Sequence, residues 1–331
     1  MRPLSVVLRD DSAAPRVRAR MAYAALATGL LALIAAAPPH AGAAANQPLP
    51  ANVEAAFPGL SSGPLRPARL TNLANGVILS AAPLKIREAE IAAEIAKAPE
   101  QLRSQLRNNE FFVLEQLATR ELLLREARAW AASTKRTRKP ANDNDLIRAY
   151  AESAIPQPTV SDAELRQAYG AMEEALGGAP FDRVRDDVRT YVLEKKRQAA
   201  ADAYVAGVGR RTRVEVDRSW AEKQSRRAAD NPVDKARRSG RPTLVDFGAS
   251  GCRPCDMMAP ILVSLRDKYA KQANVVFIHV REEQVLSSRY GVRTIPLQVF
   301  FDREGKEVFR HEGFYPQAEI EARLAALGVK R

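Results

Sequence analysis

The residues with the clearest chemistry are Cys252 and Cys255, the only two cysteines in a chain of 331 residues. Two intervening residues place both sulfur atoms on one helical turn. A predicted strand precedes the pair and a predicted helix follows it. Cys252 would therefore lie at a helix N-terminus, where unpaired N–H groups and the helix dipole favour a thiolate. This arrangement predicts a reversible disulfide in which Cys252 attacks first and the buried Cys255 acts second.

The two residues between the cysteines fit this chemistry. Arg253 adds a positive charge beside the first sulfur, and Pro254 stands in the first helical turn, where its missing N–H is not needed. A zinc site would need two further ligands, and the chain has no third cysteine. An inert pair of core cysteines is a second alternative, but Arg253 and Pro254 do not suit a buried apolar run. We expect no metal and no cofactor.

Three separated stretches make the C-terminal third resemble thioredoxin. Residues 244–255 read LVDFGASGCRPC, residues 258–260 read MAP and residues 290–296 read YGVRTIP. They occur in the same order as in thioredoxins, and the resemblance extends over about residues 233–328. It implies an α/β domain, and the element order over the same region (β-α-β-α-β-β-α) independently indicates a mixed sheet covered by helices.

The resemblance also assigns roles to residues near the cysteines. Asp246 matches a buried carboxylate that accepts a proton from the second cysteine, and burial would raise the pKa of such a group. Pro296 matches a cis-proline facing the disulfide, so that Thr294 and Ile295 would offer their backbone to an extended substrate. Two alternatives remain open: Asp246 as a solvated carboxylate at a strand end, and Pro296 as an ordinary trans proline.

The chain also departs from the thioredoxin pattern. Gly248 and Gly251 occupy positions where thioredoxins usually carry tryptophan, and Phe277 or Ile278 stands near the place of a common lysine. These changes imply wider access around Cys252 and a different proton path. Residues 309–314, together with the MMAP stretch around Met258, resemble exported thioredoxins that work with membrane thiol reductases of the cytochrome-c-biogenesis type. Such a reductase is the expected electron donor.

The N-terminal segment is typical of export. Residues 1–20 contain five arginines, residues 21–37 are uncharged and mostly apolar, and residues 41–43 read AGA. This order predicts a signal peptide over 1–43 and a periplasmic protein. An uncleaved inner-membrane anchor is the alternative, because a run of 17 residues is at the lower limit for a spanning helix.

The rest of the chain divides by composition. We expect a flexible, proline-rich leader over 44–71, a mainly helical domain over 72–217, a polar linker over 218–232 and the thioredoxin-fold domain over 233–331. The helical part resembles the N-terminal region of SurA-type periplasmic chaperones. That resemblance implies that a strand near Val77 pairs with a strand at 214–216 and closes a client-binding cradle. The alternative is a helical spacer or dimerisation unit.

The formal charge of +12 arises from 51 basic and 39 acidic residues that are interleaved along the chain. Such interleaving is typical of solvated helix faces and argues against nucleic-acid binding. The sequence therefore predicts an exported protein-disulfide reductase whose partners are protein disulfide clients, unfolded ones among them. Strong oxidants commonly carry histidine between the cysteines, and none is present here, although Arg253 acts in the oxidising direction. The alternative is a periplasmic chaperone or docking protein in which the thioredoxin fold mainly binds.

The export prediction has a direct test. The exported protein should begin near Ala44 and remain in the soluble fraction, because cleavage after residue 43 removes the whole apolar run. N-terminal sequencing of protein recovered from the periplasm measures this. Recovery of residues 21–37 in the membrane fraction would show that the segment is an anchor instead.

Overall fold

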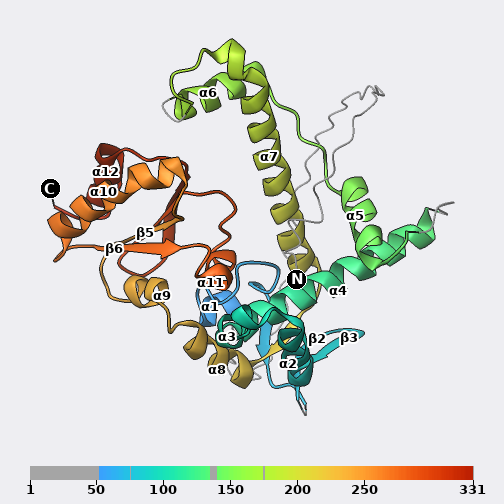
Figure 1. Ribbon diagram of the computed structural model, residues 1–331. Helices are drawn as coiled ribbons and strands as arrows, with labels where there is room; N and C mark the ends of the chain where they lie inside the picture. Colours follow the sequence, from blue (N-terminus) through green and yellow to red (C-terminus); the bar gives the residue numbers. More distant parts are fainter. Residues whose placement is uncertain (1–51, 75, 135–139, 174–175, 331) are drawn as a thin grey trace, which may run out of the picture. The chain divides into compact units, whose positions relative to one another are not determined.

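The computed structural model describes residues 52–74, 76–134, 140–173 and 176–330 (Figure 1). The predicted signal peptide and the first residues of the predicted leader lie outside these ranges. Within them, no helix combines the length and the apolar character needed to cross a membrane.

The C-terminal domain is built on a four-stranded sheet with the order β6-β5-β7-β8. Its central strands are β5 (Thr243–Gly248) and β7 (Leu297–Phe301), and every residue of both is buried. The outer strands are β6 (Asn274–His279) and β8 (Glu307–Glu312). β5 runs parallel to β6 and antiparallel to β7. Burial on both faces explains why β7 is apolar except at Gln298 and why β5 contains Leu244, Val245 and Phe247.

Helices cover both faces of this sheet (Figure 1). α10 (Arg253–Tyr269) and α12 (Gln317–Ala326) share one core with Leu244 and Phe300 of the sheet. α9 (Pro232–Arg237) and α11 (Gln284–Arg289) lie on the opposite face, where Val233 and Leu286 pack against Val245, Phe247 and Val299. The mixed α/β sheet predicted from the sequence is confirmed.

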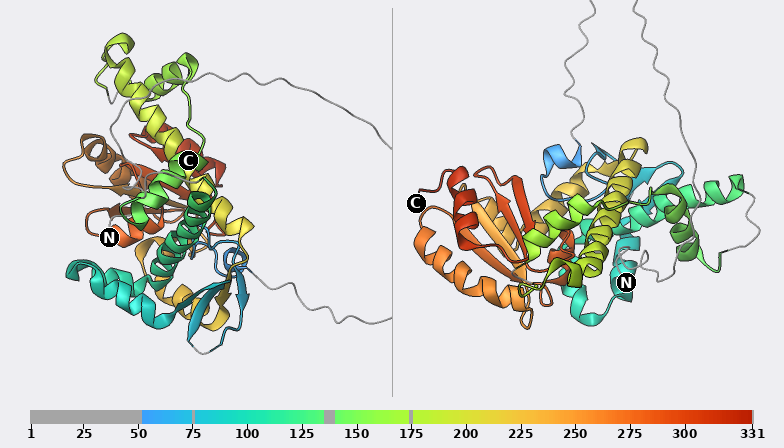
Figure 2. Two further views of the ribbon diagram at one scale, coloured as in Figure 1. Left: turned by 90° about the vertical axis from the view of Figure 1, so that its right-hand side faces the viewer. Right: turned by 90° about the horizontal axis from the view of Figure 1, so that it is seen from above.

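The preceding part is mainly helical, as expected. Its longest elements are α4 (Glu110–Ser133) and α7 (Phe181–Arg211), and α6 (Asp162–Met172) packs along α7 (Figure 2). A capping box begins α6: the Ser161 side chain accepts from the Glu164 N–H, and the Glu164 side chain accepts from the Ser161 N–H. The remaining helices are α2 (Glu88–Lys97), α3 (Glu100–Asn108) and α5 (Asp143–Ala154).

A second sheet closes the helical part, with the order β1-β4-β2-β3. Its strands are β1 (Arg69–Thr71), β2 (Val77–Ala81), β3 (Leu84–Arg87) and β4 (Glu215–Asp217). Leu79 of β2 is paired with Val216 of β4, so the expected pairing of an early strand with a late one is present. This pairing does not by itself identify a family, and the likeness to SurA-type chaperones stays a prediction.

The expected linker over 218–232 is largely a packed helix, α8 (Arg218–Ala228). Trp220 is buried and stacks on Phe111 of α4, with ring centroids 6.0 Å apart. Gln224 Nε2 donates to Glu110 Oε2 at 2.8 Å. The linker prediction was wrong because α8 buries only a narrow stripe of side chains, which its many charged residues conceal in the sequence.

The expected flexible leader also contains ordered structure from residue 52 onward. It includes α1 (Val53–Ala56) and β1, and Leu65 is fully buried. Glu115 of α4 is buried and accepts hydrogen bonds from the Ser61 hydroxyl and from the backbone N–H groups of Ser62, Gly63 and Leu65. Burial raises the pKa of Glu115, and these bonds oppose the shift. These bonds from a distant carboxylate help to hold the backbone of the proline-rich segment in place.

A buried charge cluster lies behind the sheet of the C-terminal domain. Asp234 of α9 is fully buried, and its carboxylate accepts from Arg237 Nε at 2.6 Å and from Arg289 Nη2 at 2.6 Å. The Tyr290 hydroxyl donates to the same carboxylate at 3.1 Å. Burial alone would raise the pKa of Asp234, but the charges of Arg289 and Arg237 outweigh it and hold the pKa below its usual range.

The same two arginines bind backbone carbonyls that lie outside the C-terminal domain. Arg289 Nη1 donates to Ala228 O at 2.7 Å, and its Nη2 donates to Gly59 O at 3.1 Å. Arg237 Nη2 donates to Pro58 O at 2.8 Å. Buried donors need acceptors, so the C-terminal domain relies on the preceding part of the chain to satisfy the hydrogen bonds of these two arginines.

This dependence predicts a large effect of Arg289→Met. The variant keeps much of the side-chain volume but leaves Asp234 with one guanidinium and removes the donor from two backbone carbonyls, Ala228 O and Gly59 O. We expect the free energy of unfolding to fall by about 3 kcal/mol. Urea unfolding followed by far-UV circular dichroism measures the change. The control is Arg238→Met, an exposed arginine that directly follows Arg237. Equal stability of the two variants would show that the cluster contributes nothing.

Candidate redox-active disulfide site

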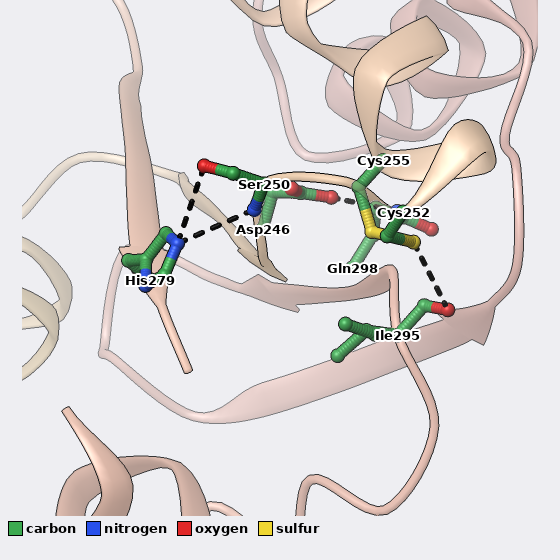
Figure 3. Close-up of a disulfide and its surroundings, with 7 residues drawn as sticks. All are labelled: Asp246, Ser250, Cys252, Cys255, His279, Ile295 and Gln298. Atoms are coloured by element: carbon green, nitrogen blue, oxygen red, sulfur yellow. Dashed lines mark hydrogen bonds between the residues drawn. A yellow bond between two sulfur atoms is a disulfide. The ribbon is translucent and has the colours of Figure 1, made fainter. Parts of the chain in front are cut away.

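Cys252 and Cys255 form a disulfide at the start of α10, with Cα atoms 5.2 Å apart (Figure 3). Cys252 is the N-cap residue with an extended backbone, and Pro254 follows in the first turn. Cys255 is buried, with 6% of its surface exposed, whereas Cys252 is partly exposed. Cys252 is therefore the sulfur that an incoming group can reach.

The predicted cis-proline lies beside this disulfide. The Ile295–Pro296 peptide bond is cis, and Cys252 Sγ lies 4.0 Å from Ile295 O (Figure 3). The alternative of an ordinary trans proline is therefore wrong. Pro296 O accepts from Gly313 N at 2.8 Å. Within the described ranges, no backbone hydrogen bond involves the N–H or C=O of Thr294. That backbone is available to pair with an extended chain.

Asp246 lies beneath the disulfide on β5 and is fully buried. Its Oδ1 accepts from Gln298 Nε2 at 2.7 Å, while the buried Oδ2 has no hydrogen-bond partner among the described residues. Burial raises the pKa of Asp246 to about 6, and the bond from Gln298 opposes the shift. The alternative of a solvated carboxylate is therefore wrong. The free oxygen and the raised pKa suit a group that exchanges a proton near neutral pH.

Gly248 separates this carboxylate from the second cysteine. A Cβ atom at this position would lie 3.5 Å from Asp246 Oδ2 and 3.5 Å from the Cβ of Cys255. It would also approach Phe277 Cε2 to 3.0 Å. A larger side chain would thus enter the space between the carboxylate and Cys255. The glycine therefore leaves the space between these two groups free of a side chain.

Two polar groups near the site were not predicted. Gln298 is a polar residue in the otherwise apolar strand β7. The strand register pairs it with Asp246, which explains why an amide side chain stands at this position. One polar residue inside an otherwise apolar strand was the available signal. His279 lies opposite Gly248 in the register, and its Nε2 is 3.3 Å from Ser250 N and 3.4 Å from Ser250 Oγ (Figure 3).

Arg253, which was expected to influence the pKa of the Cys252 thiol, is exposed. No ion pair to Arg253 occurs in the described part of the chain. Its charge therefore remains next to Cys252, where it favours the thiolate form once the disulfide is reduced. Among the described residues, no group of three or more His, Cys, Asp or Glu side chains is placed to hold a metal ion.

Comparisons with known proteins concern the C-terminal part. Residues 229–328 match the family model described as a thioredoxin-like domain. Over 96 residues the chain is 34% identical to a thioredoxin from Alicyclobacillus acidocaldarius subsp. acidocaldarius, a match that covers 29% of this chain and 90% of that protein. Over 108 residues it is 35% identical to a thiol:disulfide interchange protein TxlA homolog from Synechocystis sp., covering 32% of this chain and 59% of that protein.

A solved structure of a mutant thioredoxin from Halobacterium salinarum NRC-1 is 29% identical, covers 30% of this chain and 84% of its own, and has a TM-score of 0.27. The sequence matches, the β6-β5-β7-β8 sheet and the disulfide beside a cis-proline agree with one another. Through its residues 229–328, the chain belongs to the thioredoxin family.

Proposed function

We propose that the protein is an exported thiol–disulfide oxidoreductase that reduces disulfides in polypeptide clients, with the helical part contributing to client binding. The observation that carries this proposal is the position of Cys252. Its sulfur is partly exposed, begins a helix and lies 4.0 Å from the carbonyl of Ile295, next to the cis-proline. A client disulfide aligned along Thr294 and Ile295 would meet that sulfur directly.

The reaction balances through two exchanges. The Cys252 thiolate attacks one sulfur of the client disulfide, forms a mixed disulfide and releases the other client sulfur as a thiolate. The Cys255 thiolate then attacks Cys252 Sγ, which forms the Cys252–Cys255 disulfide and releases the first client sulfur. Asp246 takes the proton from the Cys255 thiol in this second step. Two electrons pass from the protein dithiol to the client.

Each turnover leaves the protein oxidised, so a dithiol donor must reduce it again. The likeness of residues 309–314 to exported thioredoxins supports a membrane thiol reductase of the cytochrome-c-biogenesis type as that donor. It would act in the periplasm, where the predicted signal peptide directs the chain. In the alternative function, the thioredoxin fold serves mainly as a binding module. The two functions differ in whether the cysteine pair catalyses disulfide reduction.

The role of the cysteines predicts three results for the full chain. With a dithiol donor, it should reduce the interchain disulfides of insulin, and Cys252→Ser should abolish this activity. Cys255→Ser should accumulate a mixed disulfide between Cys252 and the client, because the resolving thiol is absent. In the reduced wild type, iodoacetamide should modify Cys252 first, because Cys255 is buried. The docking alternative would be favoured if the protein bound clients but wild type and Cys252→Ser did not differ in insulin reduction.

The role of Asp246 predicts a pH-dependent effect of Asp246→Asn. With a pKa of about 6, the wild-type carboxylate is mostly ionised above pH 6 and can accept the proton from Cys255. Resolution of the mixed disulfide should therefore be at least about tenfold slower in the variant at pH 8, and the difference should shrink toward pH 5. Stopped-flow measurement of the second exchange gives these rates. The control is Asp256→Asn, an exposed carboxylate on α10.

The same substitution predicts a stability effect of defined sign. Because folding raises the pKa of Asp246 above its unfolded value of about 3.9, the stability associated with its protonated form is present below about pH 4 and is lost as the pH rises through about 6. Asp246→Asn should therefore gain roughly 2 to 3 kcal/mol relative to wild type between pH 4 and pH 7. A constant difference across this range would contradict the raised pKa.

A further inference from the structure

Two ion pairs join α7 to the C-terminal domain near the cis-proline. Asp202 Oδ1 lies 2.8 Å from Arg293 Nη2, and Arg293 immediately precedes Thr294. Lys195 Nζ lies 3.3 Å from Glu312 Oε2, and Glu312 is paired with Leu297, the residue after Pro296. One helix thus contacts the residue before Thr294 and the β8 residue that is paired with Leu297, the residue after Pro296.

The spacing of these residues shows how α7 is oriented. Lys195 and Asp202 are seven positions apart, so they lie on one face of the helix and span about 10 Å along its axis. The five residues from Arg293 to Leu297 are joined by four peptide bonds, one of them cis, so they span less than the roughly 13 Å of a fully extended stretch. Because α7 makes two contacts from positions seven residues apart on one face, this part of the helix runs alongside the region of the cis-proline and does not touch it at one point only.

Between the two ion pairs, the helix face carries only a small side chain and is accessible to solvent. Ala199 lies between Lys195 and Asp202 on this face, and all three residues are exposed. Arg293 and Asp202 keep 38% and 54% of their side-chain surface exposed, and Lys195 and Glu312 keep 45% and 27%. Exposed ion pairs contribute no more than about 1 kcal/mol each. These contacts hold α7 near the segment and yield readily to a competing ligand.

We propose that the Lys195–Ala199–Asp202 face of α7 is a second wall of the client site. An extended polypeptide pairs with the free backbone of Thr294, presents its disulfide to Cys252 and lies against this face of α7. The inference rests on the proposed function and makes it more specific, because it assigns client contact in the helical part to one helix face. A small disulfide that needs only Cys252 does not use this wall.

The test compares Ala199→Trp with a matched substitution on the other side of α7. Thr190 is exposed and lies nine positions earlier, which places it half a turn away around the helix. Ala199→Trp should lower kcat/KM for an unfolded polypeptide disulfide by about tenfold or more, because the indole occupies the client's place. It should leave kcat/KM for hydroxyethyl disulfide unchanged. Thr190→Trp should change neither value.

Photocrosslinking provides a second measurement that does not depend on the activity of a tryptophan variant. In the Cys255→Ser background, benzoylphenylalanine at position 199 should crosslink to a polypeptide trapped on Cys252, and the same group at position 190 should not. Equal crosslinking at both positions, or equal effects of Ala199→Trp on both substrates, would overturn the inference and leave the proposed function intact. A wild-type protein inactive on both substrates would overturn the proposed function and this inference together.

Discussion

The buried carboxylate of Asp234 is the interaction on which the arrangement of the molecule depends. It binds Arg237 and Arg289, and these arginines in turn bind the carbonyls of Pro58, Gly59 and Ala228. Arg289 ends α11 and directly precedes Tyr290, whose hydroxyl also binds Asp234. The chain then continues to the cis-proline without another helix or strand. One charge cluster therefore fixes the start of the segment that leads to the cis-proline and attaches the earlier part of the chain to it.

Two buried aspartates in the same domain show how partners decide the function of a carboxylate. Asp234 and Asp246 are both fully buried, yet the pKa of Asp234 is held low and the pKa of Asp246 is raised to about 6. The difference is that two guanidinium groups compensate Asp234, whereas Asp246 has only the neutral amide of Gln298. The compensated carboxylate stays charged and is structural. The uncompensated one changes its protonation in the range where thiol exchange occurs, and it lies beside Cys255.

Features with a local signal were predictable from the sequence, and features that depend on distant partners were not. The motif at Cys252, the apolar runs of β5 and β7 and the cap at Ser161 each have a pattern within a few residues. The family resemblance added the cis bond before Pro296, which the residues alone leave open. The Glu115 contacts with the expected leader join residues about 50 positions apart, and the bond from Arg289 to Gly59 joins residues 230 apart. The burial of Trp220 likewise depends on Phe111, which is distant in the sequence. The residues of α8 alone therefore predicted a polar linker.

The departures from thioredoxin at Gly248 and Gly251 are connected to the role proposed for α7. Gly251 has φ of 74°, in the left-handed region that favours glycine, and no atom lies within 4 Å of a Cβ placed there. A tryptophan at this position would be strained, so the surface before Cys252 stays open. An open surface gives a client sulfur access to Cys252 but little area with which to hold the client. Under the role proposed for α7, that area comes from the helix, which contacts Arg293 through Asp202 and Glu312 of β8 through Lys195. In that proposal, the helix compensates for the small side chains at positions 248 and 251.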